Sequence, residues 1–236
     1  MSIAENISTI RERIAQAASR ANRSPEEITL MAVTKTVAAA RIKEAYSAGI
    51  RVFGENRVQE FTAKAVALHD LQEAQWHLIG HLQSNKSNQA VELFAAIDSL
   101  DSMRLAQRLN SAAGALGRKR ETLIEINIGG EASKHGFSPD SPELQDLLKQ
   151  SAEFTHLKIG GLMAVPPFTE DAEGARPYFR RLRQLRDKLA KISGMSLGAL
   201  SMGMSHDFEV AIEEGSTCVR VGTAIFGERP GADQHD

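Results

Sequence analysis

The segment Ile28-Thr-Leu-Met-Ala-Val-Thr-Lys35 is a near-continuous apolar run that ends in a lysine. A run of this kind predicts a strand buried on both faces, as in a parallel sheet covered by helices. Lys35 then lies at the carboxyl end of the strand, where open α/β sheets and (β/α)₈ barrels carry their functional residues. Loss of hydration there favours the neutral amine, so Lys35 is a candidate nucleophile that forms a Schiff base. An ordinary ion pair at the strand end is the alternative.

The rest of the chain repeats short apolar segments, each followed by a segment with helical spacing. After the first strand, we expect strands at 50–56, 76–80, 95–98, 122–128, 157–163, 197–202 and 217–221. Isoleucines at helical spacing from Ile3 to Ile14 predict a further amphipathic helix before the first strand. About eight alternations predict an α/β fold, namely a (β/α)₈ TIM barrel with an extra N-terminal helix. A doubly wound open sheet is the alternative, and residues 1–236 contain no linker that would divide them into domains.

Composition argues against several classes of protein. Lys and Arg total 28 against 30 Asp and Glu, and aromatic residues make up 5%, so the footprint of a nucleic-acid-binding protein is missing. The sole cysteine, Cys218, cannot form an internal disulfide, which favours a reducing compartment and a buried thiol. No segment resembles a signal peptide or reaches the roughly 20 apolar residues that span a bilayer. We therefore expect a soluble, cytoplasmic protein without nucleic-acid or membrane partners.

Polar residues follow many of the expected strands. In a barrel the carboxyl ends of all strands form one rim, so residues at these ends meet in one site. The strand-end residues are Lys35, Asn56, His77, Gly80, Asn127, Met163, Ser201 and Arg220. Together they predict a functional site at the rim, although each one alone is also typical of an ordinary strand end.

The last two expected strands run into glycine-containing segments typical of anion sites. Leu-Ser-Met-Gly-Met-Ser at 200–205 precedes a short expected helix, and Gly222-Thr223 follows the final strand. Backbone N–H groups in such turns bind phosphate together with Ser and Thr hydroxyls. Barrels often hold a phosphate after strands seven and eight. Turn glycines with Ser or Thr caps are the alternative.

A Schiff-base lysine and a phosphate site on adjacent strands together suggest pyridoxal 5′-phosphate (PLP), which carries an aldehyde and a phosphate. In a closed barrel the eighth strand adjoins the first, so Lys35 lies near Gly222 and Thr223. Arg220 would face the pyridine nitrogen as a donor and keep that nitrogen unprotonated. A salt bridge across the barrel mouth is the alternative for Arg220. A Schiff-base aldolase that acts on phosphosugars without a cofactor would also explain the lysine and the phosphate site.

Motifs spread over the whole chain, in order, carry a resemblance to a known family. They are Met31–Thr36, Phe53–Glu60, His77–Lys86, Gly161–Met163, Leu200–Ser205 and Val219–Gly227. They resemble the pyridoxal phosphate homeostasis protein family, which implies a barrel like the N-terminal domain of alanine racemase. The resemblance implies that PLP is bound as an internal aldimine on Lys35.

The resemblance also suggests roles for the other site residues. Asn56 matches the residue beside the cofactor ring, and Arg220 matches the partner of the pyridine nitrogen. The phosphate-binding positions match Ser201, Ser205, Gly222 and Thr223. We assign no catalytic residue and no metal ligand. Within the segment 127–136, Asn127, Glu131 and Lys134 receive no role.

The family resemblance implies intracellular PLP homeostasis with little or no turnover, and PLP-dependent apoenzymes are the candidate recipients. A PLP-dependent amino-acid racemase or lyase is the alternative. Racemisation needs acid–base groups on both faces of the substrate, and alanine racemases take a tyrosine from an additional domain and the partner subunit. The only tyrosines here, Tyr46 and Tyr178, lie in expected helices, so we expect the second base to be absent. The lack of a second domain predicts a monomer.

Overall fold

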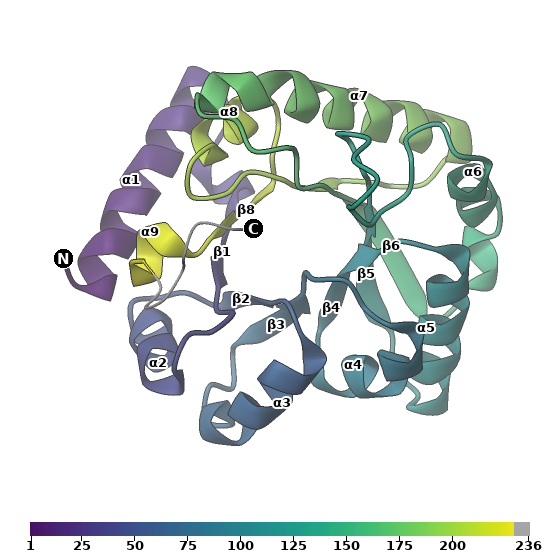
Figure 1. The fold of residues 1–236 in the computed structure, drawn as a ribbon, viewed down its shortest axis with the longest axis horizontal. Coiled ribbons are helices and arrows are strands. Elements are labelled where there is room, and N and C mark those ends of the chain that lie inside the picture. The colour runs from purple at the N-terminus through teal and green to yellow at the C-terminus, as the bar shows by residue number, and fades with distance from the viewer. Residues whose placement is uncertain (229–236) are drawn as a thin grey trace.

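A computed structural model describes residues 1–228 and shows a closed barrel of parallel strands surrounded by helices (Figure 1). The strands are β1 (Thr29–Val33), β2 (Val52–Glu55), β3 (Gln75–Leu78), β4 (Ala96–Leu100), β5 (Arg120–Glu125), β6 (Leu157–Met163), β7 (Ala199–Ser201) and β8 (Cys218–Val221). The helices are α1 (Ile3–Arg20), α2 (Ala39–Ser47), α3 (Val58–Ala65), α4 (Ser87–Leu93), α5 (Met103–Ala115), α6 (Pro142–Lys149), α7 (Arg176–Ser193), α8 (Phe208–Glu213) and α9 (Thr223–Phe226). Each strand pairs with the next in sequence, and β8 pairs with β1. The predicted (β/α)₈ barrel is therefore confirmed, and the doubly wound open sheet is wrong.

The extra N-terminal helix is also confirmed as α1, which packs against α2, α8 and α9 on the outside of the barrel (Figure 1). Its apolar face is buried, as the spacing of its isoleucines requires. The Asn6 amide donates to the carbonyl oxygen of Ile225 at 2.9 Å, which ties the first helix to α9. The buried residues of α1 are Ile3, Ile7, Ile10, Ile14, Ala17 and Ala18.

The two longest helices, α1 and α7, have 18 residues each and are amphipathic. In α7 the side chains of Phe179, Leu182, Leu185 and Leu189 face the core, whereas arginines and lysines occupy the outer surface. Within residues 1–228, none of the helices has the length and hydrophobicity that crossing a membrane requires.

Several strands end earlier at the rim than the sequence predicts, most clearly β1 and β5. β1 ends at Val33, so Lys35 lies in a turn. β5 ends at Glu125 instead of reaching residue 128, and an isolated bridge joins Ile126 to Phe137. Ile126 and Ile128 are buried in the segment that follows β5. The apolar run therefore reflects burial of a loop segment and not a longer strand.

Candidate functional site

Lys35 lies half-buried in the turn directly after β1. The next residue, Thr36, has a φ of +62°, which is unusual for a β-branched side chain. The Thr36 N–H donates to Glu60 Oε1 at 2.6 Å, and the Val37 N–H donates to the Thr34 carbonyl oxygen at 3.0 Å. A strained backbone of this kind persists only where its surroundings fix it. The turn therefore holds Lys35 in a defined position at the rim.

A buried charge network fixes this turn from neighbouring elements. The Lys64 Nζ of α3 donates to the Thr34 carbonyl oxygen at 2.9 Å, to Glu55 Oε1 at 2.7 Å and to Glu60 Oε1 at 3.0 Å. The Thr34 hydroxyl donates to the same Glu55 oxygen at 2.6 Å. Burial raises the pKa of Glu55 above its ordinary value, although the bonds from Lys64 and Thr34 oppose this. Burial also acts to raise the pKa of Glu60, but the Thr36 N–H and Lys64 bring it below the ordinary value.

Asn56 is half-buried in the bend after β2, the strand next to β1. A Cβ at Gly80 would lie 2.3 Å from the Asn56 carbonyl oxygen, so only glycine lets the segment after β3 pack against Asn56. The Ile79 N–H donates to the Glu55 carbonyl oxygen at 2.9 Å and continues the contact. Lys35 and Asn56 therefore lie at adjacent strand ends, as the sequence predicts.

Closure of the barrel brings the glycine-containing end of β8 beside the end of β1. Met31 of β1 pairs with Arg220 of β8. A Cβ at Gly222 would lie 3.5 Å from the Val33 Cβ, an ordinary contact, so packing alone does not require glycine at this position. Thr223 is exposed and begins α9, whose first N–H groups have no acceptor within the helix. This strand end therefore offers backbone donors and a hydroxyl on the strand that adjoins β1.

The segment between β7 and α8 packs against both β8 and α9. Gly203 has a φ of +93°, and a Cβ there would lie 2.5 Å from the Ala211 Cβ, so its glycine serves the close approach to α8. The Gly203 carbonyl oxygen accepts from the Arg220 N–H at 2.9 Å. Ser205 Oγ accepts from the Ala224 N–H at 3.4 Å. Ser205 therefore lies against the first turn of α9.

Arg220 is 4% exposed, and its side chain reaches from β8 to the ends of β7 and β6. Its Nη1 donates to Ser201 Oγ at 2.7 Å, and its Nη2 donates to the Ala164 carbonyl oxygen at 2.9 Å. Burial lowers the pKa of Arg220, and nearby acidic groups, including Asp98 and Glu125, oppose this shift. An arginine nevertheless stays charged. The two bonds hold the guanidinium in place, and the Ser201 hydroxyl is one of its acceptors.

Three further titratable groups lie on β3, β4 and β5. His77 Nδ1 is 3.1 Å from Asp98 Oδ1. Burial lowers the pKa of His77, but the Asp98 carboxylate outweighs it and raises that pKa above the ordinary value. Burial and, to a smaller extent, the Asp101 carboxylate raise the pKa of Glu125 to about 7, although Arg220 opposes this shift. Glu125 Oε2 is buried and has no hydrogen-bond partner within residues 1–228.

Some of these site residues are evident only in the structure. The sequence predicts His77 at a strand end but gives no role to Asp98, Glu125 or Lys64. The Glu60 and Lys64 spacing along one helix, directly after Glu55, is the signal that could have indicated the buried network.

The segment after β5 is organised by Asn127. Its Oδ1 accepts from the Gly130 N–H at 3.0 Å, and its Nδ2 donates to the carbonyl oxygens of Glu131 at 2.8 Å and Lys134 at 3.3 Å. The Lys134 ammonium forms an ion pair with Glu131 and donates to the Pro166 carbonyl oxygen at 3.3 Å. The hydrogen bonds of Asn127, to which the sequence assigns no role, therefore serve the loop itself.

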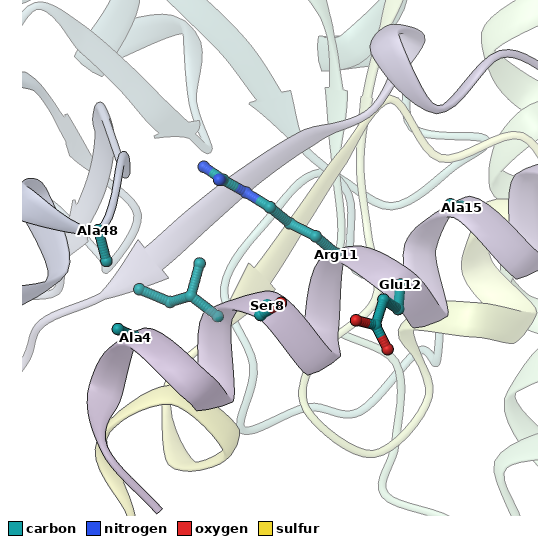
Figure 2. Close-up of a pocket in the computed structure, with 7 residues that line it drawn as sticks. Ala4, Ser8, Arg11, Glu12, Ala15 and Ala48 are labelled. Atoms are coloured by element: carbon teal, nitrogen blue, oxygen red, sulfur yellow. The ribbon is translucent and has the colours of Figure 1, made fainter.

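A shallow hollow of about 430 Å³ lies on the outer surface between α1 and α2 (Figure 2). Ala4, Ser8 and Arg11 of α1 line it together with Ala48, which follows α2. None of its lining residues comes from a strand end. The hollow is therefore separate from the site at the rim.

Comparisons with known proteins agree with this arrangement. A family model described as alanine racemase, N-terminal domain, matches residues 5–230. A protein of Aquifex aeolicus named pyridoxal phosphate homeostasis protein is 46% identical over 229 residues, covering 97% of this chain and 99% of the relative. The solved structure of PipY of Synechococcus elongatus PCC7942, with PLP bound, has a TM-score of 0.85 at 40% identity and covers 96% of this chain and 100% of that one. An alanine racemase of Clostridium difficile shares the fold, with a TM-score of 0.73 at 15% identity over 97% of this chain and 58% of that one.

Proposed function

Because the chain belongs to the pyridoxal phosphate homeostasis protein family, we propose that it binds PLP on Lys35 and takes part in intracellular PLP homeostasis. The observation that carries this proposal is the pairing of β1 with β8. It brings an amine-bearing turn and the start of α9 to adjacent strand ends. PLP carries the aldehyde and the phosphate that these two features would bind.

The residues at the rim fit such a cofactor. Packing does not require glycine at position 222. The lack of a side chain there is consistent with the close approach of a phosphate to the backbone N–H. The Thr223 hydroxyl is exposed beside it, and Ser205 lies against the same turn. We propose that these three residues hold the phosphate and that Asn56 lies beside the ring. The phosphate-binding role of Ser201 stays a prediction. The Ser201 hydroxyl accepts a bond from Arg220, which supports a role for Ser201 in holding the Arg220 side chain.

We propose that Arg220 faces the pyridine nitrogen. The side chain is fixed by Ser201 and by the Ala164 carbonyl oxygen, and it presents only donors. A donor opposite this nitrogen keeps it unprotonated, so the bound ring is a weak electron sink. PLP supplies carbanion stabilisation when it is bound, and Arg220 limits that chemistry. This supports storage and delivery over catalysis.

We propose that turnover is absent. Tyr46 and Tyr178 lie on α2 and α7, in the outer helix layer (Figure 1), and the Tyr46 ring packs 4.1 Å from the Arg51 guanidinium. Both tyrosines are partly buried against the hydrophobic core, which supports the absence of a second base at the rim. We expect the protein to exchange the α-proton of alanine with deuterium no faster than free PLP does. An enzymatic rate would instead support the racemase or lyase.

We further propose that the chain acts as a monomer in the cytoplasm and delivers PLP to PLP-dependent apoenzymes. The exposed position of Thr223 supports release of the cofactor into solvent or to a recipient. Incubation of the PLP-loaded protein with an apoenzyme should restore that enzyme's activity. Sedimentation should give the mass of one chain.

The test of the proposed function is the absorption spectrum after incubation with PLP, followed by borohydride reduction and peptide mapping. We expect a yellow species whose reduced adduct maps to Lys35. Lys35→Ala should lose the covalent adduct and bind PLP weakly and reversibly. Lys134→Ala is the matched control, because this lysine lies at the same rim but is held by Glu131.

Two outcomes would contradict the proposal in different ways. An adduct on Lys86 or Lys134 would refute the role of Lys35 and keep the cofactor. A colourless protein without an adduct would refute the cofactor and favour the phosphosugar aldolase that the residues alone leave open.

A further inference from the structure

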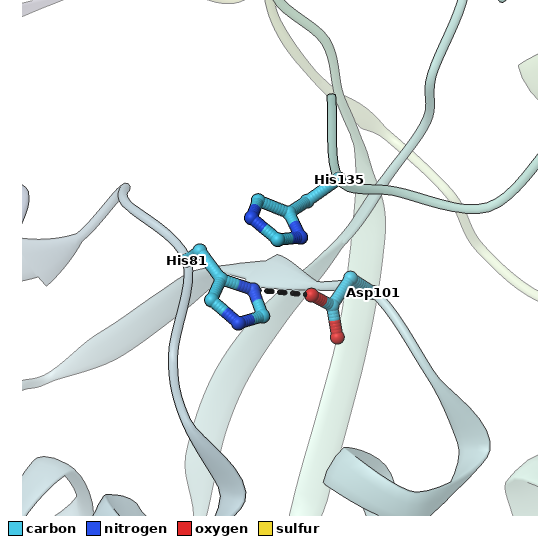
Figure 3. Close-up of side chains that lie close together, drawn as sticks. All are labelled: His81, Asp101 and His135. Atoms are coloured by element: carbon cyan, nitrogen blue, oxygen red, sulfur yellow. Dashed lines mark hydrogen bonds and ion pairs between the residues drawn. The ribbon is translucent and has the colours of Figure 1, made fainter. Parts of the chain in front are cut away.

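Three side chains from neighbouring strand ends meet at the rim, outside the proposed cofactor site (Figure 3). His81 follows β3, Asp101 follows β4 directly, and His135 lies in the loop after β5. Because β3, β4 and β5 are consecutive in the barrel, these segments are neighbours. In the closed order of strands they lie across the mouth from β8 and β1, which carry Lys35 and Thr223.

The three side chains converge closely. His81 Nδ1 lies 2.7 Å from Asp101 Oδ2. The His81 and His135 rings are nearly parallel, at 9°, and their centroids are 3.6 Å apart. One candidate ligand atom from each residue lies within 4.8 Å of the other two. Figure 3 shows the His135 ring facing the His81 ring, with the Asp101 carboxylate at the edge of both.

Ordered contacts hold the residues that carry these groups. The Asp101 side chain is 9% exposed, and its Oδ1 accepts from the hydroxyl of Ser102, the N-cap of α5, at 3.1 Å. His135 follows Lys134, whose carbonyl oxygen accepts from Asn127 and whose ammonium donates to Pro166. The His81 side chain is 39% exposed, which leaves an ion a path from solvent.

We propose that His81, Asp101 and His135 form a binding site for a divalent transition-metal ion of the zinc class. Two imidazole nitrogens and one carboxylate oxygen suit Zn²⁺, Co²⁺ or Ni²⁺, whereas Mg²⁺ and Ca²⁺ prefer oxygen ligands. Ligand atoms around a tetrahedral zinc lie about 3.3 Å apart. Because a metal lies in the plane of each imidazole that binds it, the exposed His135 ring would have to turn out of the stack with His81 to complete the site. Solvent would occupy the remaining position.

A bound ion would connect the segments after β3, β4 and β5 on one side of the barrel mouth. The sequence predicts no metal ligand here, because the three residues are far apart along the chain and meet only through the register of the barrel. The site uses none of the residues that we assign to PLP. Its test is therefore independent of the proposed function.

The test is metal titration of the full chain after chelator treatment, without added PLP. Zn²⁺ affinity is measured by competition with a chromophoric chelator, and Co²⁺ is followed by its visible ligand-field bands. We expect one ion per chain. His81→Ala, His135→Ala and Asp101→Asn should each weaken Zn²⁺ binding at least about 100-fold, since loss of a group that only orients a metal ligand already costs about 10- to 100-fold.

His69→Ala is the matched control, because His69 is an exposed histidine that lies after α3. Its Nδ1 is 2.7 Å from the carbonyl oxygen of Val66. It should bind Zn²⁺ as the unchanged protein does. Circular dichroism should show that all variants keep the fold. Absence of saturable one-to-one binding would overturn the proposal, and so would full affinity in any of the three ligand variants.

Discussion

The turn after β1 and the loop after β5 lie at the same rim but are held in different ways. The short turn around Lys35 depends on Glu55 of β2 and on Glu60 and Lys64 of α3. The loop after β5 depends mainly on Asn127, which bonds to backbone groups a few residues away. One segment is fixed by other elements of the fold, and the other is fixed largely by itself.

This difference has a physical consequence for each segment. Glu55 is fully buried and Lys64 nearly so, and a buried charge that loses its partner destabilises the native state. The turn that carries Lys35 should therefore be as stable as the barrel. The Asn127 hydrogen bonds of the loop after β5 stay within the loop, so this part of it should open locally at lower free energy. The following changes test that distinction.

Lys64→Met should have the largest effect. It leaves Glu55 Oε1 without its ammonium partner and releases the Thr34 carbonyl oxygen, so the free energy of unfolding should fall by about 3 kcal/mol. Urea denaturation with an unchanged m-value measures this loss. Covalent capture of PLP should also slow, because the turn around Lys35 loses its support.

Two controls belong with this change. Lys158→Met removes a lysine whose pair with Glu121 is largely exposed on both sides and should leave the urea midpoint unchanged. Glu55→Gln combined with Lys64→Met should recover much of the lost stability, since no buried charge is then left alone. Equal midpoints for Lys64→Met and Lys158→Met would show that the buried network does not fix the turn.

Glu125 tests the base of the loop after β5, where the buried carboxyl has no lysine partner. Burial raises its pKa from 4.5 to about 7, so between these values the native state binds more protons than the unfolded chain. The free energy of unfolding should therefore fall as pH rises from 4.5 to 7, by at most about 3 kcal/mol, and then level off. Glu125→Gln should remove this pH dependence. The free energy of unfolding of the variant, relative to that of the unchanged protein, should therefore be higher at pH 8 than at pH 4.5. A stability difference that does not vary with pH would show that Glu125 is ionised in the native state.

The same contrast explains what the sequence could predict. The barrel and the extra helix follow from local patterns, because apolar runs and helical spacing recur along the chain. The sequence predicts site roles for Lys35, Asn56, Gly222 and Thr223 because each closely follows an apolar run. It predicts none for Asp98 and Lys64, since their partners come from other elements and depend on strand register and side-chain packing.

The sequence also predicts the ends of the strands poorly, because the pattern of apolar residues does not show where strand pairing stops. Ile126 and Ile128 continue the apolar pattern of β5, but they are buried in the loop segment instead of in a ladder. Burial fixes the hydrophobic pattern, whereas hydrogen-bond pairing fixes the strand. The pattern alone cannot distinguish the two.

Thr223→Ala tests the strand end beside the Lys35 turn. Loss of a hydroxyl bond to a phosphate should weaken PLP retention by about 1–3 kcal/mol. The comparison is best made in the Lys35→Ala background by equilibrium dialysis, because covalent capture then does not mask the phosphate contribution. Thr9→Ala on the outer face of α1 is the control and should retain PLP unchanged. Equal retention by both variants would remove Thr223 from the phosphate site.

Asn127→Ala should have the smallest effect on global stability. It removes three hydrogen bonds, but all of them lie within the loop, so the free energy of unfolding should fall by only about 1 kcal/mol. Hydrogen exchange should instead quicken at the Gly130 amide, while the amides of β1 and β2 keep their protection. If the amides of β1 lost protection equally, the loop would be part of the same cooperative unit as the Lys35 turn. The two ways of holding the rim would then not differ in energy, and only their geometry would distinguish them.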